Sequence, residues 1–387
     1  MKLRRLLLPF TPLLFPISLL LRAPAVAGDP VAASQKSPPD KEESKSFAEQ
    51  LWSLPVLYKN KDNPFLQELA LVGRYQGQWH STSSHTGGDA GWENRRARLG
   101  LEAKFLGAFE FEGEFNLAWG KDNEGRLFRE VDTAAFKYVP NEDFYAIAGK
   151  QKVKITQEFA TSNNRILTVE RSLLVNQVIP DKVGGLVVGN KFGDFLIEGG
   201  VYSGDLTEEW LLPRFGAGYG FSVRVIYHPS DKSEIRLDYF HQDGERENIA
   251  FETYGNIVSL NSTNKWGRWG LIGDIMLAGG VHGTPDVYGV MVMPHFDITG
   301  KLRAVFRYQY ASSDASDGLD LQSRYERVSI GPGRSGSGRD YHALYAGLNY
   351  YIYGDRLKLM SGLEYASMGG DANFDAWTLF GGCRLYF

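Results

Sequence analysis

Cysteine is almost absent from this chain, since Cys383 is the only one among 387 residues. Without a second thiol, an intrachain disulfide scaffold is excluded. Disorder over the whole chain is excluded as well, because 43% of the residues are hydrophobic and 13% are aromatic, enough to bury a large apolar surface. Glycine is plentiful: the chain has 44 glycines among its 387 residues, which is more than the usual share of about 7%. The length allows two or three soluble domains or one large β-domain.

Long apolar runs are scarce, and the N-terminal one is followed by a cleavage pattern. Residues 6–21 are apolar, follow a basic N-terminus and precede an Ala-Val-Ala sequence that ends at Ala27. This order predicts a secretory signal peptide over residues 1–27. The alternative is a membrane-anchoring helix, which the three prolines within the run and its short length disfavour.

An excess of basic charge is also missing. The formal net charge is −4, and removal of residues 1–27 would take away four basic residues and no acidic one, leaving −8. This balance argues against a nucleic-acid partner. Residues 28–62 are polar and rich in Pro, Lys, Glu and Ser, which predicts a linker with one short helix around residues 46–54. The pattern is then uniform to the last residue, so residues 63–387 are expected to form one domain.

Alternation of apolar and polar side chains dominates that domain. In residues 109–117 (FEFEGEFNL) aromatic residues alternate with glutamates. Residues 69–80 and 97–105 follow the same period, and Arg96 and Arg98 lie on the polar face. A period of two predicts strands with one apolar and one polar face. A soluble β-sandwich would show the same period, so the period alone does not decide the fold.

The lengths of the segments favour a membrane protein. Many of the candidate strands reach the ~9–11 residues that a tilted strand needs to cross a bilayer, whereas soluble strands usually have about 5–6. The sixteen candidate segments are 66–80, 94–105, 108–118, 131–139, 143–154, 183–190, 194–203, 217–228, 233–242, 250–260, 265–278, 286–295, 301–311, 340–352, 356–367 and 374–387.

The connections between the segments alternate in length, with short turns at 106–107, 140–142 and 354–355. Aromatic residues also gather near segment ends, as at the two interfaces of a membrane. Together these features predict a transmembrane antiparallel β-barrel of about 16 strands in a bacterial outer membrane, with both chain ends, and hence the linker, on the periplasmic side. The other connections are 81–93, 119–130, 155–182, 204–216, 279–285, 312–339 and 368–373.

The last segment carries a first resemblance. Residues 377–387 alternate in polarity and end at Phe387. This segment resembles the C-terminal strand of bacterial outer-membrane proteins. The resemblance implies that Phe387 is the signal by which the barrel-assembly machinery recognises the chain.

Within that class, the chain resembles the phosphate-selective porin O/P family. The matches are a Gly-basic-x-Lys strand end, a Glu-Arg-Ser loop element and an Asp-x-x-Gly start of the next strand. The residues concerned are Gly149-Lys150-Gln151-Lys152, Glu158, Ser162, Glu170-Arg171-Ser172-Leu173 and Asp181-Lys182-Val183-Gly184. After Lys152 the chain departs from the Lys-x-Pro-Phe-Gly of the family. The resemblance implies a 16-stranded channel, often a homotrimer, whose third long extracellular loop folds into the lumen and narrows it.

The third long connection, residues 155–182, is distinctive in itself. With 312–339 it is the longest, and it is apolar for a surface loop. A loop packed inside a barrel needs such residues. A loop folded over the outer rim carries them too, so this alternative stays open. The apolar residues are Ile166, Leu167, Val169, Leu173, Leu174, Val175 and Ile179.

Charged side chains are expected to line the lumen and to set its selectivity. Arginine suits phosphate and carboxylate because its fork donates two hydrogen bonds at fixed geometry. Inward acids such as Glu102, Glu114 and Asp238 can pair with these cations, so an anion-preferring constriction and a weakly selective pore both stay open. The candidates for the constriction are Arg165, Glu170 and Arg171 from the loop, and Arg74, Arg96, Arg98, Lys150 and Lys152 from the facing wall.

The sequence therefore predicts a porin for passive diffusion of small hydrophilic solutes, with anions or phosphate as candidates. The alternatives are a barrel enzyme and a plugged structural or adhesion barrel without conductance. The seven histidines are scattered, and no nucleophile motif accompanies them, so no catalytic residue is expected. His80, His85 and Asp89 lack the spacing of a metal motif, and residues 331–336 (GPGRSG) match a nucleotide-binding pattern only formally. No metal or cofactor is expected.

Overall fold

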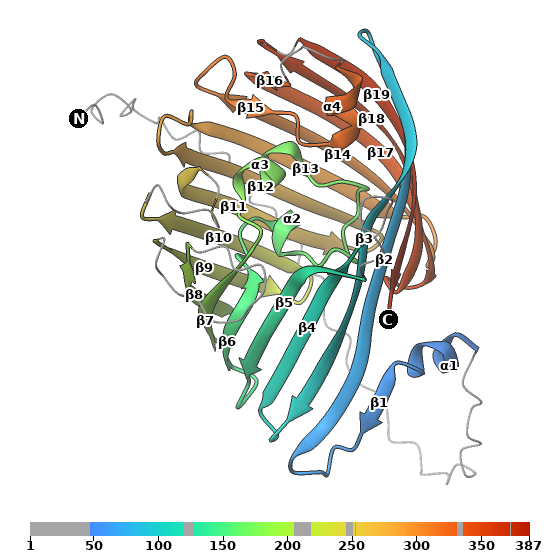
Figure 1. Cartoon of the computed structure of the whole chain (residues 1–387), viewed down its shortest axis with the longest axis vertical. Coiled ribbons are helices and arrows are strands. Elements are labelled where there is room, and N and C mark those ends of the chain that lie inside the picture. The colour runs from blue at the N-terminus through green and yellow to red at the C-terminus, as the bar shows by residue number, and fades with distance from the viewer. Residues whose placement is uncertain are drawn as a thin grey trace, which may run out of the picture. The chain divides into compact units, whose positions relative to one another are not determined.

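The computed structural model describes residues 47–118, 127–204, 218–244, 251, 253–330, 336–371 and 373–387. The predicted signal peptide, residues 28–46 of the predicted linker and the glycine-rich residues 331–335 lie outside these described residues. Strands dominate the described part (Figure 1). Four short helices accompany them: α1 (Phe47–Ser53), α2 (Gln157–Ala160), α3 (Leu173–Val178) and α4 (Arg324–Ser329). No helix among the described residues is long and apolar enough to cross a membrane.

Sixteen long antiparallel strands form the main sheet, as the alternation predicts. They have between 9 and 19 residues each. The strands are β2 (Leu66–Ser84), β3 (Gly88–Phe105), β4 (Phe109–Leu117), β5 (Phe128–Tyr138), β6 (Phe144–Lys152), β7 (Lys182–Phe192), β8 (Phe195–Ser203), β9 (Tyr219–Ser230), β10 (Ser233–Gln242), β11 (Tyr254–Trp266), β12 (Trp269–Gly280), β13 (Val287–Asp297), β14 (Leu302–Ser313), β17 (Asp340–Tyr353), β18 (Leu357–Gly369) and β19 (Phe374–Tyr386). Three short strands complete the described set: β1 (Val56–Lys59), β15 (Leu319–Asp320) and β16 (Ser337–Gly338).

The sheet closes on itself, which confirms the predicted barrel. Each long strand pairs with its neighbours in sequence, with β14 followed by β17. The ring is completed where β19 pairs with β2, from Ala376 opposite Ser84 to Tyr386 opposite Arg74. Closure leaves no long strand with an unpaired edge, which open sheets must otherwise protect.

The two ends of the barrel differ. At the turn end, the strands are joined by short connections such as 193–194, 231–232 and 267–268. At the loop end lie the longer connections, of which 153–181 is the third. The expected long connection at 81–93 is wrong, because β2 and β3 continue their pairing up to Ser83 and Gly88. The loop between them is therefore limited to residues 85–87.

The two faces of the barrel reverse the usual distribution of a soluble protein. On β17, Leu344 and Leu348 are 58% and 44% exposed on the outer face. The residue after Leu348, Asn349, is fully buried, and Arg307 on β14 and Glu364 on β18 are buried as well. An apolar outer face and a polar interior are what a bilayer-spanning barrel requires.

The C-terminal residue, Phe387, lies at the seam between β19 and β2. Phe387 and Gly73 exchange two backbone hydrogen bonds of 3.0 Å. The phenylalanine ring covers Gly73 so closely that a Cβ there would lie 2.2 Å from Cζ of the ring. In the range predicted as linker, β1 pairs with the turn-end part of β2, and Trp52 of α1 donates its indole N–H to the carbonyl of Tyr386 at 2.8 Å.

Candidate functional site

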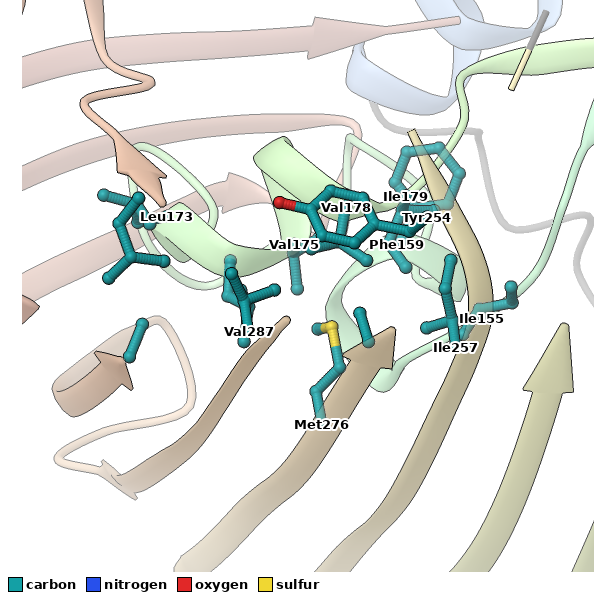
Figure 2. Packing of buried hydrophobic residues seen from close by; sticks show 14 of the residues in the cluster. Ile155, Phe159, Leu173, Val175, Val178, Ile179, Tyr254, Ile257, Met276 and Val287 are labelled. Atoms are coloured by element: carbon teal, nitrogen blue, oxygen red, sulfur yellow. The ribbon is translucent and has the colours of Figure 1, made fainter. Parts of the chain in front are cut away.

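The connection between β6 and β7, called here the β6–β7 segment (residues 153–181), packs against strands from much of the barrel wall. It contains α2 and α3, and α2 contacts β11 and β12 (Figure 1). Figure 2 shows Ile155 and Val178 of this segment beside Ile257 and Met276 of the strands. All four belong to one cluster of buried hydrophobic residues. Because the cluster removes apolar side chains of the segment from water, it stabilises the packing of the segment against the strands.

Acidic and amide side chains of the wall bind backbone N–H groups of the segment. Asp238 on β10 accepts a hydrogen bond from the N–H of Thr156 at 3.0 Å. Asp274 on β12 accepts from Gln157 at 3.2 Å, and Gln309 on β14 accepts from Leu173 at 2.8 Å. Backbone groups buried away from water need such partners, so the wall replaces the solvent for this segment.

Donor side chains of four other wall positions bind backbone carbonyls of the same segment. These donors come from β14, β17, β18 and β19, and all four contacts are between 2.7 and 2.8 Å. We refer to them as the carbonyl clamp. The pairs are Arg307 with the carbonyl of Glu170, Asn349 with Leu167, Lys358 with Ile166 and Arg384 with Val169.

A further contact holds α2 and α3 together. Glu158 of α2 accepts hydrogen bonds from the backbone N–H of Ser172 at 3.0 Å and from its hydroxyl at 2.5 Å. Its other oxygen accepts from Arg307 at 3.2 Å, and Arg307 also binds Glu364 at 2.9 Å. The segment is therefore fixed both to itself and to the wall.

A second connection lies on top of the β6–β7 segment. Residues 314–330, called here the cover segment, include β15 and α4. The side chain of Gln177 on α3 donates to the carbonyl of Gly318 at 2.8 Å and accepts from the N–H of Asp320 at 3.0 Å. The carbonyl of Ser329 accepts from the hydroxyls of Ser84 and Thr86, both at 2.9 Å.

Open space remains beside β2 to β7, in two cavities. The turn-side cavity has a volume of ≈ 490 Å³ and the loop-side cavity one of ≈ 440 Å³. Lys152 and Lys182 line both, so the two cavities adjoin at these two side chains. Phe159 and Arg171 of the β6–β7 segment form part of the loop-side wall. This is the candidate site: a passage between strands β2–β7 and the β6–β7 segment.

The charge of the two cavities differs. Six basic and four acidic residues line the turn-side cavity, whereas seven basic and two acidic residues line the loop-side cavity. A cleft lined by one sign of charge raises the local concentration of the opposite ion. The basic residues of the loop-side cavity are Arg95, Arg96, Arg98, Arg129, Lys152, Arg171 and Lys182, and the acidic ones are Glu130 and Asp181.

A β-bulge explains the density of arginine in the loop-side cavity. The register between β2 and β3 shifts at Gln76 and Gly77, which are opposite Arg96 and Asn94, so Arg95 is the extra residue. Arg95 therefore joins Arg96 and Arg98 at the same cavity, although strict alternation would send it to the other face. Sequence reasoning missed Arg95 for this reason, and it missed Lys182 as a lining residue because it took that lysine only as part of a strand-start motif.

Most of these cations are compensated, but three are not ion-paired among the described residues. Arg95 pairs with Glu170 at 3.1 Å and Arg98 with Asp132 at 2.6 Å. In contrast, Arg96 donates to the neutral oxygen of Gln76 at 3.0 Å. The other two are Lys152 and Arg171, which bind neutral oxygens and lie over the ring of Phe159.

Lys152 and Arg171 both lie over the ring of Phe159, at 5.1 and 5.3 Å from its centroid. Lys152 donates to the carbonyls of Phe159 and Thr161 at 3.1 and 3.3 Å. Arg171 donates to the carbonyl of Glu158 at 3.0 Å and to the side chain of Asn163. Both side chains are therefore held in place by neutral oxygens, without a carboxylate partner among the described residues.

Glu170 has the opposite role next to them. Its carboxylate accepts from Arg95 and, at 2.6 Å, from Gln78. Burial raises the pKa of this carboxyl, but the positive charges of Arg95 and Arg96 and the bond from Gln78 outweigh burial and lower the pKa to about 2. Glu170 therefore stays ionised and neutralises part of the positive charge that Arg95 brings to the cavity.

The remaining predicted residues are distributed more widely. Arg74 lines the turn-side cavity and binds Glu114 at 2.5 Å. Lys150 is buried on β6 and is not among the residues that line the two cavities. Arg165 is exposed and lines a different cavity near the turn end, with Arg303 and Asp355. The structure thus brings Arg96, Arg98, Lys152 and Arg171 together, with Glu170 next to Arg95, and places Arg165 apart from them.

The histidines of the first hairpin bind carboxylates. His80 and Asp89 are 2.7 Å apart, and His85 lies 2.5 Å from Asp375 on β19. In the part of the chain that the structure describes, no group of three or more His, Cys, Asp or Glu side chains is arranged to hold a metal ion.

Comparison with known proteins places these features in a family context. Residues 74–209 match the family described as phosphate-selective porin O and P, which confirms the predicted resemblance over this part of the chain. The match includes β2 from Arg74 onward, the whole of β3 and the whole β6–β7 segment. A search of curated proteins found no match.

Solved structures show the same fold at low identity. The outer membrane channel DcaP of Acinetobacter baumannii is 12% identical, with a TM-score of 0.57 over 86% of this chain and 100% of that one. An anion-selective porin from Comamonas acidovorans is 14% identical, with a TM-score of 0.58 over 82% and 99%. OmpT of Vibrio cholerae in a trimer form is 11% identical, with a TM-score of 0.53 over 82% and 99%.

Proposed function

We propose that this chain is a bacterial outer-membrane porin through which small hydrophilic solutes diffuse passively, with a preference for anions. The observation that carries the proposal is the loop-side cavity, where Arg96, Lys152 and Arg171 have no ion-pair partner among the described residues. The family match to phosphate-selective porins and the fold shared with a structure named an anion-selective porin support it. The proposed function is therefore that of a channel and not that of an enzyme.

The β6–β7 segment is the infolded third loop that narrows the lumen. Its contact with Lys358 supports this assignment, because Lys358 is the second residue of β18 and therefore lies at the turn end. A loop folded over the rim at the loop end would not reach that position. Since the segment and the cover segment fill the side of β10 to β19, solutes pass along β2 to β7.

Assembly follows the pattern expected of such porins. The protein is exported by residues 1–27, and residues 28–62 extend into the periplasm. The barrel-assembly machinery recognises Phe387, and three copies associate in the membrane lipid. The trimer form described for OmpT of Vibrio cholerae supports the last point.

Ion selectivity in planar bilayers tests the function directly. We expect stepwise single-channel conductance, and a reversal potential under a salt gradient that favours anions. Phosphate should reduce the chloride current. Conductance without ion preference would leave a general porin and remove the anion preference, whereas folded protein without any conductance would overturn the channel and favour a plugged barrel.

Single substitutions locate the selectivity. A unit charge about 4 Å from a permeating ion in water contributes about 1 kcal/mol, which is roughly fivefold in a permeability ratio. Arg96→Gln, Lys152→Gln and Arg171→Gln should therefore each lower the anion-to-cation permeability ratio by up to about fivefold. Arg165→Gln is the matched comparison, because Arg165 lines another cavity, and it should change the ratio much less. An equal effect of all four substitutions would contradict the assignment to the loop-side cavity.

A further inference from the structure

A buried carboxyl group without a cation attaches the cover segment to the barrel wall. Glu326 of α4 is 1% exposed and accepts a hydrogen bond from the hydroxyl of Tyr341 on β17 at 2.8 Å. Within the described residues it forms no ion pair. The adjacent Tyr325 donates to Glu364 on β18 at 3.2 Å, so α4 is held by one phenol–carboxyl contact on each of two strands.

The charged groups around Glu326 do not compensate it. Glu364 is itself a buried acid, and Arg307 on β14 already binds Glu364 and Glu158. On the side of β2 and β3, His80 faces the ring of Tyr325 at 5.8 Å between centroids and is paired with Asp89. An ionised Glu326 would therefore be a second negative charge beside Glu364 in a site closed to water, which is strongly unfavourable.

We propose that the cover segment opens and closes with pH, and that Glu326 is the group that releases it. In the closed state, a neutral carboxyl of Glu326 accepts the hydrogen bond of Tyr341 without placing a second negative charge beside Glu364. When Glu326 loses its proton, α4 leaves the wall and exposes the carboxylate to water. Two other contacts hold the cover segment: Ser329 bonds to the β2–β3 hairpin, and Gln177 bonds to residues 318 and 320. These hydrogen bonds join uncharged groups, so they do not compensate the negative charge of an ionised Glu326.

The direction of the pH effect follows from the burial of the acid. Burial, and then the charge of Glu364, raise the pKa of Glu326 from 4.5 to about 7, although bonds from Tyr341 and Ser323 oppose the shift. A carboxyl whose pKa is higher in the closed state stabilises that state most below pH 4.5 and progressively less up to about pH 7. Over this window the ratio of closed to open cover should fall by up to about 300-fold and then stay constant.

Hydrogen exchange of the full-length protein in lipid nanodiscs tests this inference. After correction for the intrinsic exchange rates, residues 314–330 of the wild type should be protected at pH 5 and exchange faster at pH 8. Glu326→Gln keeps the shape without the charge, so these residues should stay protected at both values. Asp317→Asn changes an exposed acid of the same segment and should behave like the wild type.

Equal protection of the wild type at both pH values would overturn the proposal, and this result does not depend on whether the variant folds. A pH response retained in Glu326→Gln would overturn it too. The consequence for transport rests on the proposed porin function: openings of higher conductance should appear at pH 8 in the wild type and not in Glu326→Gln. Absence of all conductance would refute the porin, whereas hydrogen exchange would still decide the cover.

Discussion

Asp238 is the acid on which the first turn of the β6–β7 segment depends. It is fully buried and binds two arginines at 3.1 Å, Arg224 and Arg236. The same carboxylate accepts hydrogen bonds from the backbone N–H of Thr156 and from Asn261, both at 3.0 Å. Asp238→Asn keeps the size of the side chain and, with the amide oxygen toward Thr156, keeps the bond to its N–H. The negative charge is lost, and the amide NH2 then faces Nε of Arg224 in place of an acceptor.

The expected magnitude follows from what each arginine retains. Arg224 still has Glu198 at 2.8 Å, which is buried. Arg236 is left with Glu234 at 3.3 Å, whose side chain is 30% exposed. Removing one partner of a buried ion pair costs about 3–5 kcal/mol, because the other charge stays in a site without water. Since only Arg236 loses its main partner, we expect the lower end, about 3 kcal/mol of unfolding free energy.

Urea unfolding of the protein in lipid vesicles, followed by tryptophan fluorescence, measures this change. The double variant Asp238→Asn/Arg236→Gln removes the uncompensated charge and should recover at least about 1 kcal/mol relative to the single variant. A destabilisation below about 1 kcal/mol in Asp238→Asn, or no recovery in the double variant, would refute the reasoning that Asp238 acts by compensating Arg236.

Two further predictions concern selectivity and the seam. Glu170→Gln should release Arg95 and raise the anion-to-cation permeability ratio by a few fold. The lowered pKa of Glu170 means that its carboxylate loses its charge only as the pH falls toward about 2. The difference in reversal potential between the variant and the wild type should therefore be the same at pH 5 and pH 9. Gly73→Ala should force the ring of Phe387 away and lower the temperature at which the barrel loses its heat-modifiable mobility on SDS gels. Gly381→Ala on β19 is the control, because there is open space at its Cβ position, and it should not lower this temperature. Equal melting of the two variants would contradict the role of the ring contact.

The barrel was predictable from sequence because its physics is local. Each strand must place apolar residues toward lipid and polar residues inward, so a period of two is present in every segment, and all sixteen strands were predicted with errors only at their ends. The largest error, at residues 81–93, arose because strands that extend beyond the bilayer no longer need apolar outer faces. Residues 90–93 (AGWE) show that weaker alternation, although they pair with β2.

The candidate site was predictable only in part, because a bulge changes which residues share a face. Arg96 and Arg98 were placed correctly by alternation. The one-residue shift at Gln76 and Gly77 that adds Arg95 depends on pairing across two strands. A glycine within a strand can mark a bulge, but other strands of this chain contain glycine too, so Gly77 does not single out the position. Arg165 was grouped with Arg171 because both belong to the third long connection, yet the chain between them passes from one cavity to another.

Inward charge is therefore a poor measure of what a pore attracts. Arg307, Lys358 and Arg384 all point inward and all donate to backbone carbonyls of the β6–β7 segment, so they serve as anchors of the loop. Their acceptors lie 137 to 215 residues away in the sequence. None of the three lines either of the two cavities beside β2 to β7, so their charges do not face a solute there. In the function proposed above, the cations that face a solute are those that line the loop-side cavity, among them Arg96 of β3, Lys152 of β6 and Arg171 of the β6–β7 segment.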